Sequence, residues 1–156
     1  MDQLMLILHV LAAILFLGPV TVATSTFQVR ALEVHNGNDA AKGAASVLHK
    51  ISNTYGLLSL LVPLLGFGVL FSDMTFLKEG RMHTSILLSF IAWALLFFLI
   101  LPRQKKMMAA LNLLEEDDMP AEPVHIADWN KAKGQLAMFS GIFAALWLVV
   151  AVLMVL

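Results

Sequence analysis

The sequence contains no cysteine. This absence excludes disulfides, cysteine-based zinc sites, iron–sulfur clusters and thiol catalysis together. Charge is also scarce, because Asp, Glu, Lys and Arg make up 13% of the 156 residues, whereas soluble proteins carry about 25%. Ten basic and eleven acidic residues give a formal net charge of −1, so nothing in the composition suggests a nucleic-acid partner.

Apolar residues are abundant instead, at 60% of the chain with a mean hydropathy of +0.84. A water-soluble protein of this size could not bury so much apolar surface. One membrane-spanning helix takes about 20 apolar residues, and the apolar runs predict four such spans, at about residues 4–23, 51–71, 84–101 and 136–156. We therefore expect a single-domain, all-α integral membrane four-helix bundle with up-down topology.

Local signals in the first two spans indicate irregular helices. Pro19 is expected to kink the first span, with the hydroxyls of Thr21, Thr24 and Ser25 near the freed backbone groups. The run Asn-Gly-Asn-Asp at 36–39 predicts a helix stop. Pro63 and three glycines predict an irregular second span that packs closely against a neighbour.

The third and fourth spans carry clearer boundary signals. Residues 107–116 continue the third span as a predicted helical extension with one apolar side. Pro120 and Pro123 end any helix there. Asp128 is a plausible N-cap for the fourth helix, which is expected to begin near Trp129.

The distribution of basic residues predicts the orientation. The connections at about residues 30–50 and 103–133 share one side of a four-span protein, and they hold eight of the ten basic residues. The other side holds Lys78 and Arg81. The positive-inside rule therefore predicts a multi-pass membrane protein with both connections in the cytoplasm and both termini outside.

His9 is the histidine of most interest, because it lies about five residues inside the first span, and an ionisable group at membrane depth suggests a functional site. It can be a neutral imidazole that bonds a carbonyl or hydroxyl across a helix interface. Alternatively, His9 and His83 can be the axial ligands of a b-type haem, although His9 is expected roughly 7 Å inside the boundary at which His83 lies. His35, His49 and His125 are expected on the cytoplasmic surface.

Catalytic and transport signatures are missing from the predicted spans. None of the spans contains a carboxylate, which argues against a proton pump or an ion-coupled transporter. The sequence has neither a nucleophile and base at one depth nor a phosphate-binding glycine-rich loop. The sequence therefore favours a protein that is not an enzyme, although it does not exclude catalysis. It also predicts that the protein needs neither a cofactor nor a metal.

A track of small residues runs down one side of the fourth span: Gly134, Ala137, Gly141, Ala144 and Ala145. Small residues allow helix backbones to approach closely in a membrane. The track therefore predicts a helix contact, either inside the bundle or with another subunit.

The segment from Leu8 to Gly18 reads LHVLAAILFLG. It resembles the opening span of a bacterial family of small four-span integral membrane proteins without an assigned function. A similar opening occurs in copper-resistance D-type membrane proteins and in haem-linked membrane protoporphyrinogen oxidases, and by that resemblance His9 matches their first-span histidine. Two features differ: FLGP at 16–19 replaces their Trp-x-Gly-Gly, and the third span lacks the lysine of the oxidase pattern.

These observations predict a non-catalytic accessory or assembly subunit of a larger membrane complex, for which a respiratory cytochrome assembly is the expected host. Its partners would be other integral membrane subunits, lipid and, in a homo-oligomer, further copies of the chain. The alternative is a haem b-binding membrane redox protein or oxidase that uses His9.

Overall fold

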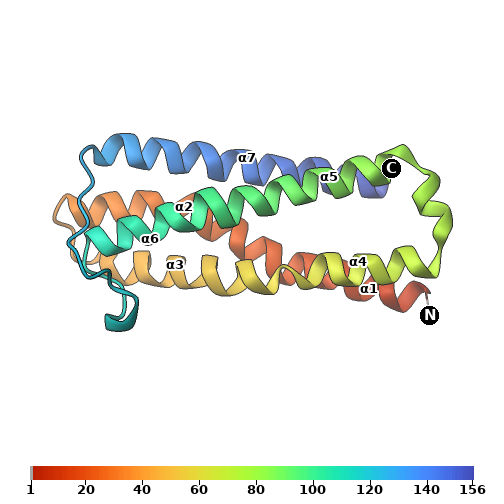
Figure 1. Cartoon of the computed structure of the whole chain (residues 1–156), viewed down its shortest axis with the longest axis horizontal. Helices are drawn as coiled ribbons and strands as arrows, with labels where there is room; N and C mark the ends of the chain where they lie inside the picture. Colours follow the sequence, from red (N-terminus) through yellow and green to blue (C-terminus); the bar gives the residue numbers. More distant parts are fainter. Residues whose placement is uncertain (1) are drawn as a thin grey trace.

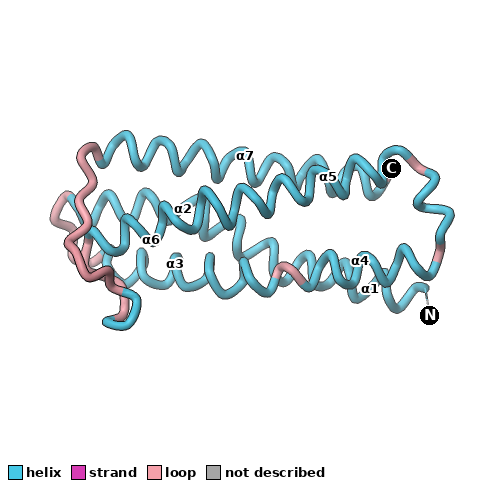
Figure 2. Tube along the Cα trace, in the orientation of Figure 1, coloured by secondary structure: helices cyan, strands magenta, loops and turns pink. Residues whose placement is uncertain are grey.

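The computed structural model describes residues 2–156, which are helical almost throughout and contain no β-strand (Figures 1 and 2). The elements in order are α1 (Asp2–Ala12), η1 (Ala13–Leu17), α2 (Gly18–His35), α3 (Ala41–Leu58), α4 (Leu61–Ser72), η2 (Met74–Lys78), α5 (Gly80–Leu95), η3 (Leu96–Ile100), α6 (Leu101–Ala110), η4 (Glu116–Asp118) and α7 (Trp129–Val155). Segments η1 and η3 are π-helical, whereas η2 and η4 are 3-10 helices.

These elements join into four long helices, each apolar and long enough to cross a membrane: Gln3–His35, Ala41–Ser72, Gly80–Ala110 and Trp129–Val155. Successive helices run in opposite directions (Figure 1). The predicted all-α four-helix bundle is therefore confirmed. With 27–33 residues and a rise of 1.5 Å per residue, the helices are about 40–50 Å long, which exceeds the roughly 30 Å thickness of a hydrocarbon core.

Both π segments precede a proline by the same spacing. η1 ends two residues before Pro19, and η3 ends two residues before Pro102. Proline lacks the backbone N–H, and its ring clashes with the carbonyl one turn earlier; the wider π turn accommodates both effects. Side chains bond nearby carbonyls, since Thr21 Oγ1 donates to the Leu17 oxygen at 2.7 Å and Arg103 Nη1 donates to the Leu99 oxygen at 3.2 Å.

The second long helix is interrupted between α3 and α4, in front of Pro63. Proline cannot supply the N–H that the Ser59 carbonyl would normally accept. The Val62 N–H bonds that carbonyl instead, at 3.0 Å, and tightens the turn. The Ser59 hydroxyl donates to the Gly56 carbonyl and accepts from Trp93 Nε1 at 3.0 Å. The predicted irregularity of this span is thus confirmed, and a buried tryptophan ties it to α5.

The two ends of the bundle pack differently. At the end with the two longer connections, α2 packs on α3 and α7, and α3 packs on α6. At the other end the principal contacts are within two pairs, α1 with α4 and α5 with α7. Figure 1 shows these pairs diverging to the right, where η2 joins one pair to the other. We call this end the fork.

The structure confirms two of the helix-boundary predictions and corrects a third. The α2 helix ends at His35, directly before the predicted stop, and Asp128 caps α7 by accepting from the Lys131 backbone N–H at 3.0 Å. The extension predicted through residue 116 is wrong, because α6 ends at Ala110. Asn112 adopts a left-handed φ of 56°, a conformation that terminates helices.

Candidate functional site

His9 faces α4 and makes a contact between helices. Its Nδ1 lies 2.9 Å from the Val62 carbonyl oxygen, and because a carbonyl can only accept, Nδ1 must carry the proton. The imidazole lies directly against Gly66, where an added Cβ would be 3.1 Å from Cε1 and 3.4 Å from Nδ1. Gly66 therefore leaves the space that the imidazole ring occupies.

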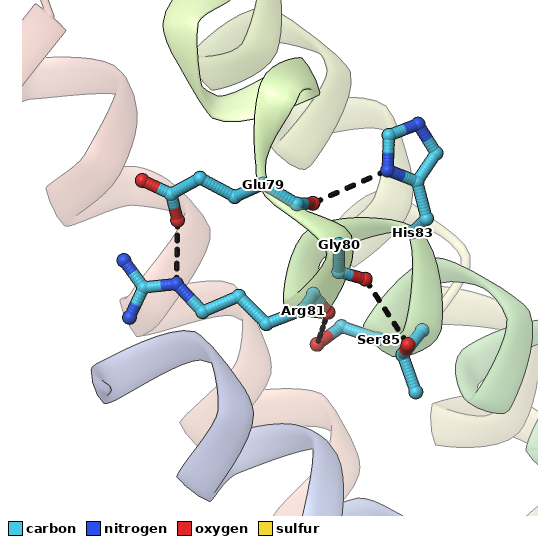
Figure 3. A network of polar contacts seen from close by, with 6 residues as sticks. Glu79, Gly80, Arg81, His83 and Ser85 are labelled. Atoms are coloured by element: carbon cyan, nitrogen blue, oxygen red, sulfur yellow. Dashed lines mark hydrogen bonds and ion pairs between the residues drawn. The ribbon is translucent and has the colours of Figure 1, made fainter.

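His83 lies in the first turn of α5, in a different environment. Its ring is exposed, and Nδ1 donates to the Glu79 carbonyl oxygen of its own helix start at 3.2 Å. Figure 3 shows His83 on one side of this turn, while the side chains of Glu79 and Arg81 pair on the other. The hydrogen bond from Arg81 lowers the pKa of the Glu79 carboxyl below its usual value.

The two histidines of the haem alternative therefore have separate partners. His9 packs on α4, and His83 bonds its own backbone at the start of α5. Within residues 2–156, no three His, Asp or Glu side chains gather closely enough to hold a metal ion. His9 therefore makes a contact between two helices, whereas His83 makes a hydrogen bond within the start of its own helix.

His49 is the clearest correction to the sequence-based expectations. It was expected on the surface, but it is 7% exposed and lies between α3 and α6. Its ring also packs 5.9 Å from the ring of Phe27, measured between centroids. The lysine that follows His49 is exposed, so adjacent residues on this helix face opposite environments. The prediction failed because it placed His49 by its polar neighbours along the chain rather than by its position around the helix.

Hydrogen bonds around His49 form a chain with one direction. Asn53 Nδ2 donates to His49 Nε2 at 3.0 Å, and His49 Nδ1 donates to Gln104 Oε1 at 3.2 Å. Gln104 Nε2 then donates to Ser52 Oγ at 3.2 Å, and that hydroxyl donates to the Leu48 carbonyl at 2.9 Å. This order requires a neutral imidazole, because a second ring proton would face the Asn53 amide hydrogens.

The first and fourth long helices also bury polar side chains. Thr24 and Gln28 of α2 and Ser140 of α7 are each at most 1% exposed. The Thr24 hydroxyl bonds the Val20 carbonyl at 2.8 Å, and Gln28 Nε2 bonds the Ser25 carbonyl at 2.8 Å. Each of the four long helices thus buries at least one polar side chain, which the sequence did not predict.

One sequence signal could have revealed this interior. The inward residues of α3 recur every three or four positions and are all small or polar: Ala41, Ala45, His49, Ser52 and Gly56. That spacing defines one helix face, and small residues on it allow close packing. Taken as one helix face, this stripe would have indicated that His49 and Ser52 are buried.

The small-residue track of α7 faces away from the bundle. Gly134, Ala137, Gly141 and Ala145 are exposed, and Ala144 is intermediate. A Cβ built on Gly134 or Gly141 would meet no atom within 4 Å. The residues that α7 buries against the bundle lie on its other side: Trp129, Leu136, Ser140, Phe143 and Val150. Of the two contacts left open by the sequence, the track therefore does not serve packing inside the bundle.

Comparison of the chain with protein-family models, with curated proteins and with solved structures finds no match.

Proposed function

We propose that this chain is a non-catalytic accessory or assembly subunit of a larger complex in the bacterial plasma membrane. In this proposal both longer connections face the cytoplasm, both termini lie outside, and the host is a respiratory cytochrome assembly. The observation that carries the proposal is the outward-facing small-residue track of α7, which no part of residues 2–156 covers.

The spacing of the track supports a helical partner. Ala137, Gly141 and Ala145 follow one another at intervals of four, so they line one side of α7. In membranes, such small-xxx-small spacing lets a second backbone approach closely and pack without bulky side chains between them. A transmembrane helix of another subunit is the occupant that this surface accommodates best.

The hydrogen bonds of His9 and His49 also favour a structural role. His9 bonds the Val62 carbonyl, and His49 bonds Gln104 and Asn53. The His9 bond connects α1 to α4, and the bonds of His49 engage both of its ring nitrogens, so neither nitrogen of His49 is free to act as a general base or a haem ligand. The bundle then serves as a rigid element that presents α7 to a partner.

A substitution in the track tests the proposal. Gly141→Leu fills the proposed contact surface, whereas Ala94→Leu adds the same side chain at an exposed position on α5. After extraction in mild detergent, affinity purification and mass spectrometry should recover the partner subunit with wild type and with Ala94→Leu, and recover much less with Gly141→Leu. Equal recovery in all three samples would contradict the proposal.

Cross-linking identifies which partner occupies the track. Because the chain has no cysteine, Gly141→Cys and the neighbouring Ile142→Cys provide a matched pair about 100° apart around the helix. Gly141→Cys should form a cross-linked product with a different membrane protein, and Ile142→Cys should not. A product of twice the mass of the chain would instead assign the track to a second copy.

A further inference from the structure

A cavity of about 350 Å³ lies between α6 and α7, where the predicted third and fourth spans meet the longer connection. Arg103 and Lys106 of α6 line it together with Gln135 of α7. Apolar walls come from Pro102, Met107 and Ile126. No carboxylate of residues 2–156 lines this cavity, which makes it a positively charged recess at the polar boundary of the apolar helices.

Arg103 is fixed in this recess by contacts with neutral groups. Its Nη1 donates to the Leu99 carbonyl, and its Cζ lies 4.7 Å from the centroid of the Phe139 ring. These contacts orient the guanidinium and leave its charge without a carboxylate partner among the described residues. Lys105 differs, because its ammonium pairs with Asp118 at 3.5 Å.

Lys106 completes the positive surface. It lies three residues after Arg103 and therefore on the same side of α6. No ion pair to Lys106 is found within residues 2–156, and its side chain is exposed. Two positive charges thus face one cavity, with the amide of Gln135 as an additional hydrogen-bond donor.

The surface next to the cavity is apolar in the direction of the spans. Phe98, one turn before Pro102, is 77% exposed. On α7, Met138 and Ile142 are 53% and 46% exposed, at one and two turns beyond Gln135. A positive recess that continues into an exposed apolar surface matches the two chemical parts of a phospholipid.

We propose that this cavity binds the headgroup phosphate of an anionic phospholipid. The guanidinium of Arg103 donates to two phosphate oxygens, as its planar fork does in other phosphate sites. Lys106 adds a point charge and Gln135 donates from its amide, while the acyl chains lie along Phe98, Met138 and Ile142. A net-negative lipid is favoured over a zwitterionic one because two positive charges face the phosphate.

Lipid binding to the purified full-length protein tests this site. Phosphatidylglycerol or phosphatidylcholine is titrated into protein in maltoside micelles, and bound lipid is counted by native mass spectrometry. One positive charge near a membrane surface contributes about 1 kcal/mol, so Lys106→Gln should raise the Kd for phosphatidylglycerol about fivefold, and Arg103→Gln with Lys106→Gln about thirtyfold. Wild type should bind phosphatidylcholine more weakly.

The controls separate a built site from general charge. Lys42→Gln with Lys50→Gln removes the same charge from the same side of the molecule but leaves the cavity intact, and its Kd should equal that of wild type. Lys106→Gln carries the test if the double variant fails to fold, because Lys106 makes no hydrogen bond to the described residues.

Three results would overturn the proposal. The first is an equal loss of affinity in the cavity variants and in the control. The second is unchanged affinity in Lys106→Gln, and the third is equal binding of phosphatidylcholine. Inorganic phosphate that binds as tightly as phosphatidylglycerol, and depends equally on Arg103 and Lys106, would instead assign the cavity to a soluble anion.

Discussion

The imidazole of His9 donates a hydrogen bond to the backbone carbonyl of Val62, 53 residues further along the chain, at 2.9 Å. The bond joins α1 to α4 within the fork, where α1 has one principal packing partner. Val62 lies directly before Pro63, in the first turn of α4. A polar contact thus reinforces the packing of α1 on its one principal neighbour.

Replacing His9 separates its structural and haem-ligand roles. His9→Gln should assemble normally, because glutamine retains a donor for Val62. His9→Leu should lose about 0.6 kcal/mol of stability, the average for interhelical hydrogen bonds in membranes. Thermal unfolding in detergent measures both effects. A visible spectrum of wild type should show no stoichiometric Soret band, and a band that disappears in His9→Gln would favour the haem alternative.

Two neighbouring glycines test the close approach of α1 and α4. Gly66→Ala places a Cβ 3.1 Å from His9 Cε1, so the ring must move and the Val62 bond should weaken. Overpacking of this kind costs about 1–3 kcal/mol. Gly68→Ala is the matched control, since its Cβ meets the flexible Met5 side chain at 3.4 Å. A lower unfolding temperature is expected in the first variant alone, and equal temperatures would place His9 elsewhere.

The hydrogen-bond chain at His49 predicts strong coupling with Gln104. His49→Leu leaves Gln104 Oε1 buried without its partner, which should cost about 1–3 kcal/mol. Gln104→Leu should cost a similar amount, but the double variant should cost less than the sum of the two. Reversible unfolding in mixed micelles gives the three values, with His125→Leu as an exposed control. Additive losses would show that the two side chains act independently.

Thiol labelling tests the orientation. Asp39→Cys and Asp117→Cys lie on the exposed longer connections, and Glu79→Cys lies at the fork. In intact cells an impermeant maleimide should label Glu79→Cys and spare the other two, whereas all three should react after the membrane is permeabilised. The positive-inside rule predicts this labelling pattern. The reverse pattern would show that the protein has the opposite orientation in the membrane.

The sequence predicts the helical architecture well because that architecture follows from long apolar runs. It also predicts the Asp128 cap and the stop after His35, since both depend on residues adjacent in sequence. The end of α6 was harder to predict. Apolar residues continue to Leu114, but Asn112 turns the backbone into the left-handed region and Leu113 bonds back to the Met108 carbonyl.

The residues of the candidate site were harder to predict from the sequence than the helices were. The sequence identified His9 by its depth within an apolar run, but could not predict that Val62 would be its partner, because the contact depends on how α1 leans onto α4. His49 was misplaced for a related reason. Its burial depends on Gln104, which lies 55 residues away and carries no charge that would draw attention to it.

The π segment η1 changes which neighbouring helices the inward residues of positions 2–35 face. On a regular helical wheel, the inward residues Met5 and His9 of α1 fall on the same side as Phe27 and Ala31 of α2. A π segment contains about one residue more than α-helical geometry requires, and one residue corresponds to about 100° of rotation. A single stripe in the sequence is therefore divided in space: its first part faces α4, and its second part faces α3 and α7. One uninterrupted pattern encodes two different neighbours, and the change of phase is what lets the first helix belong to a pair at one end and to a bundle at the other.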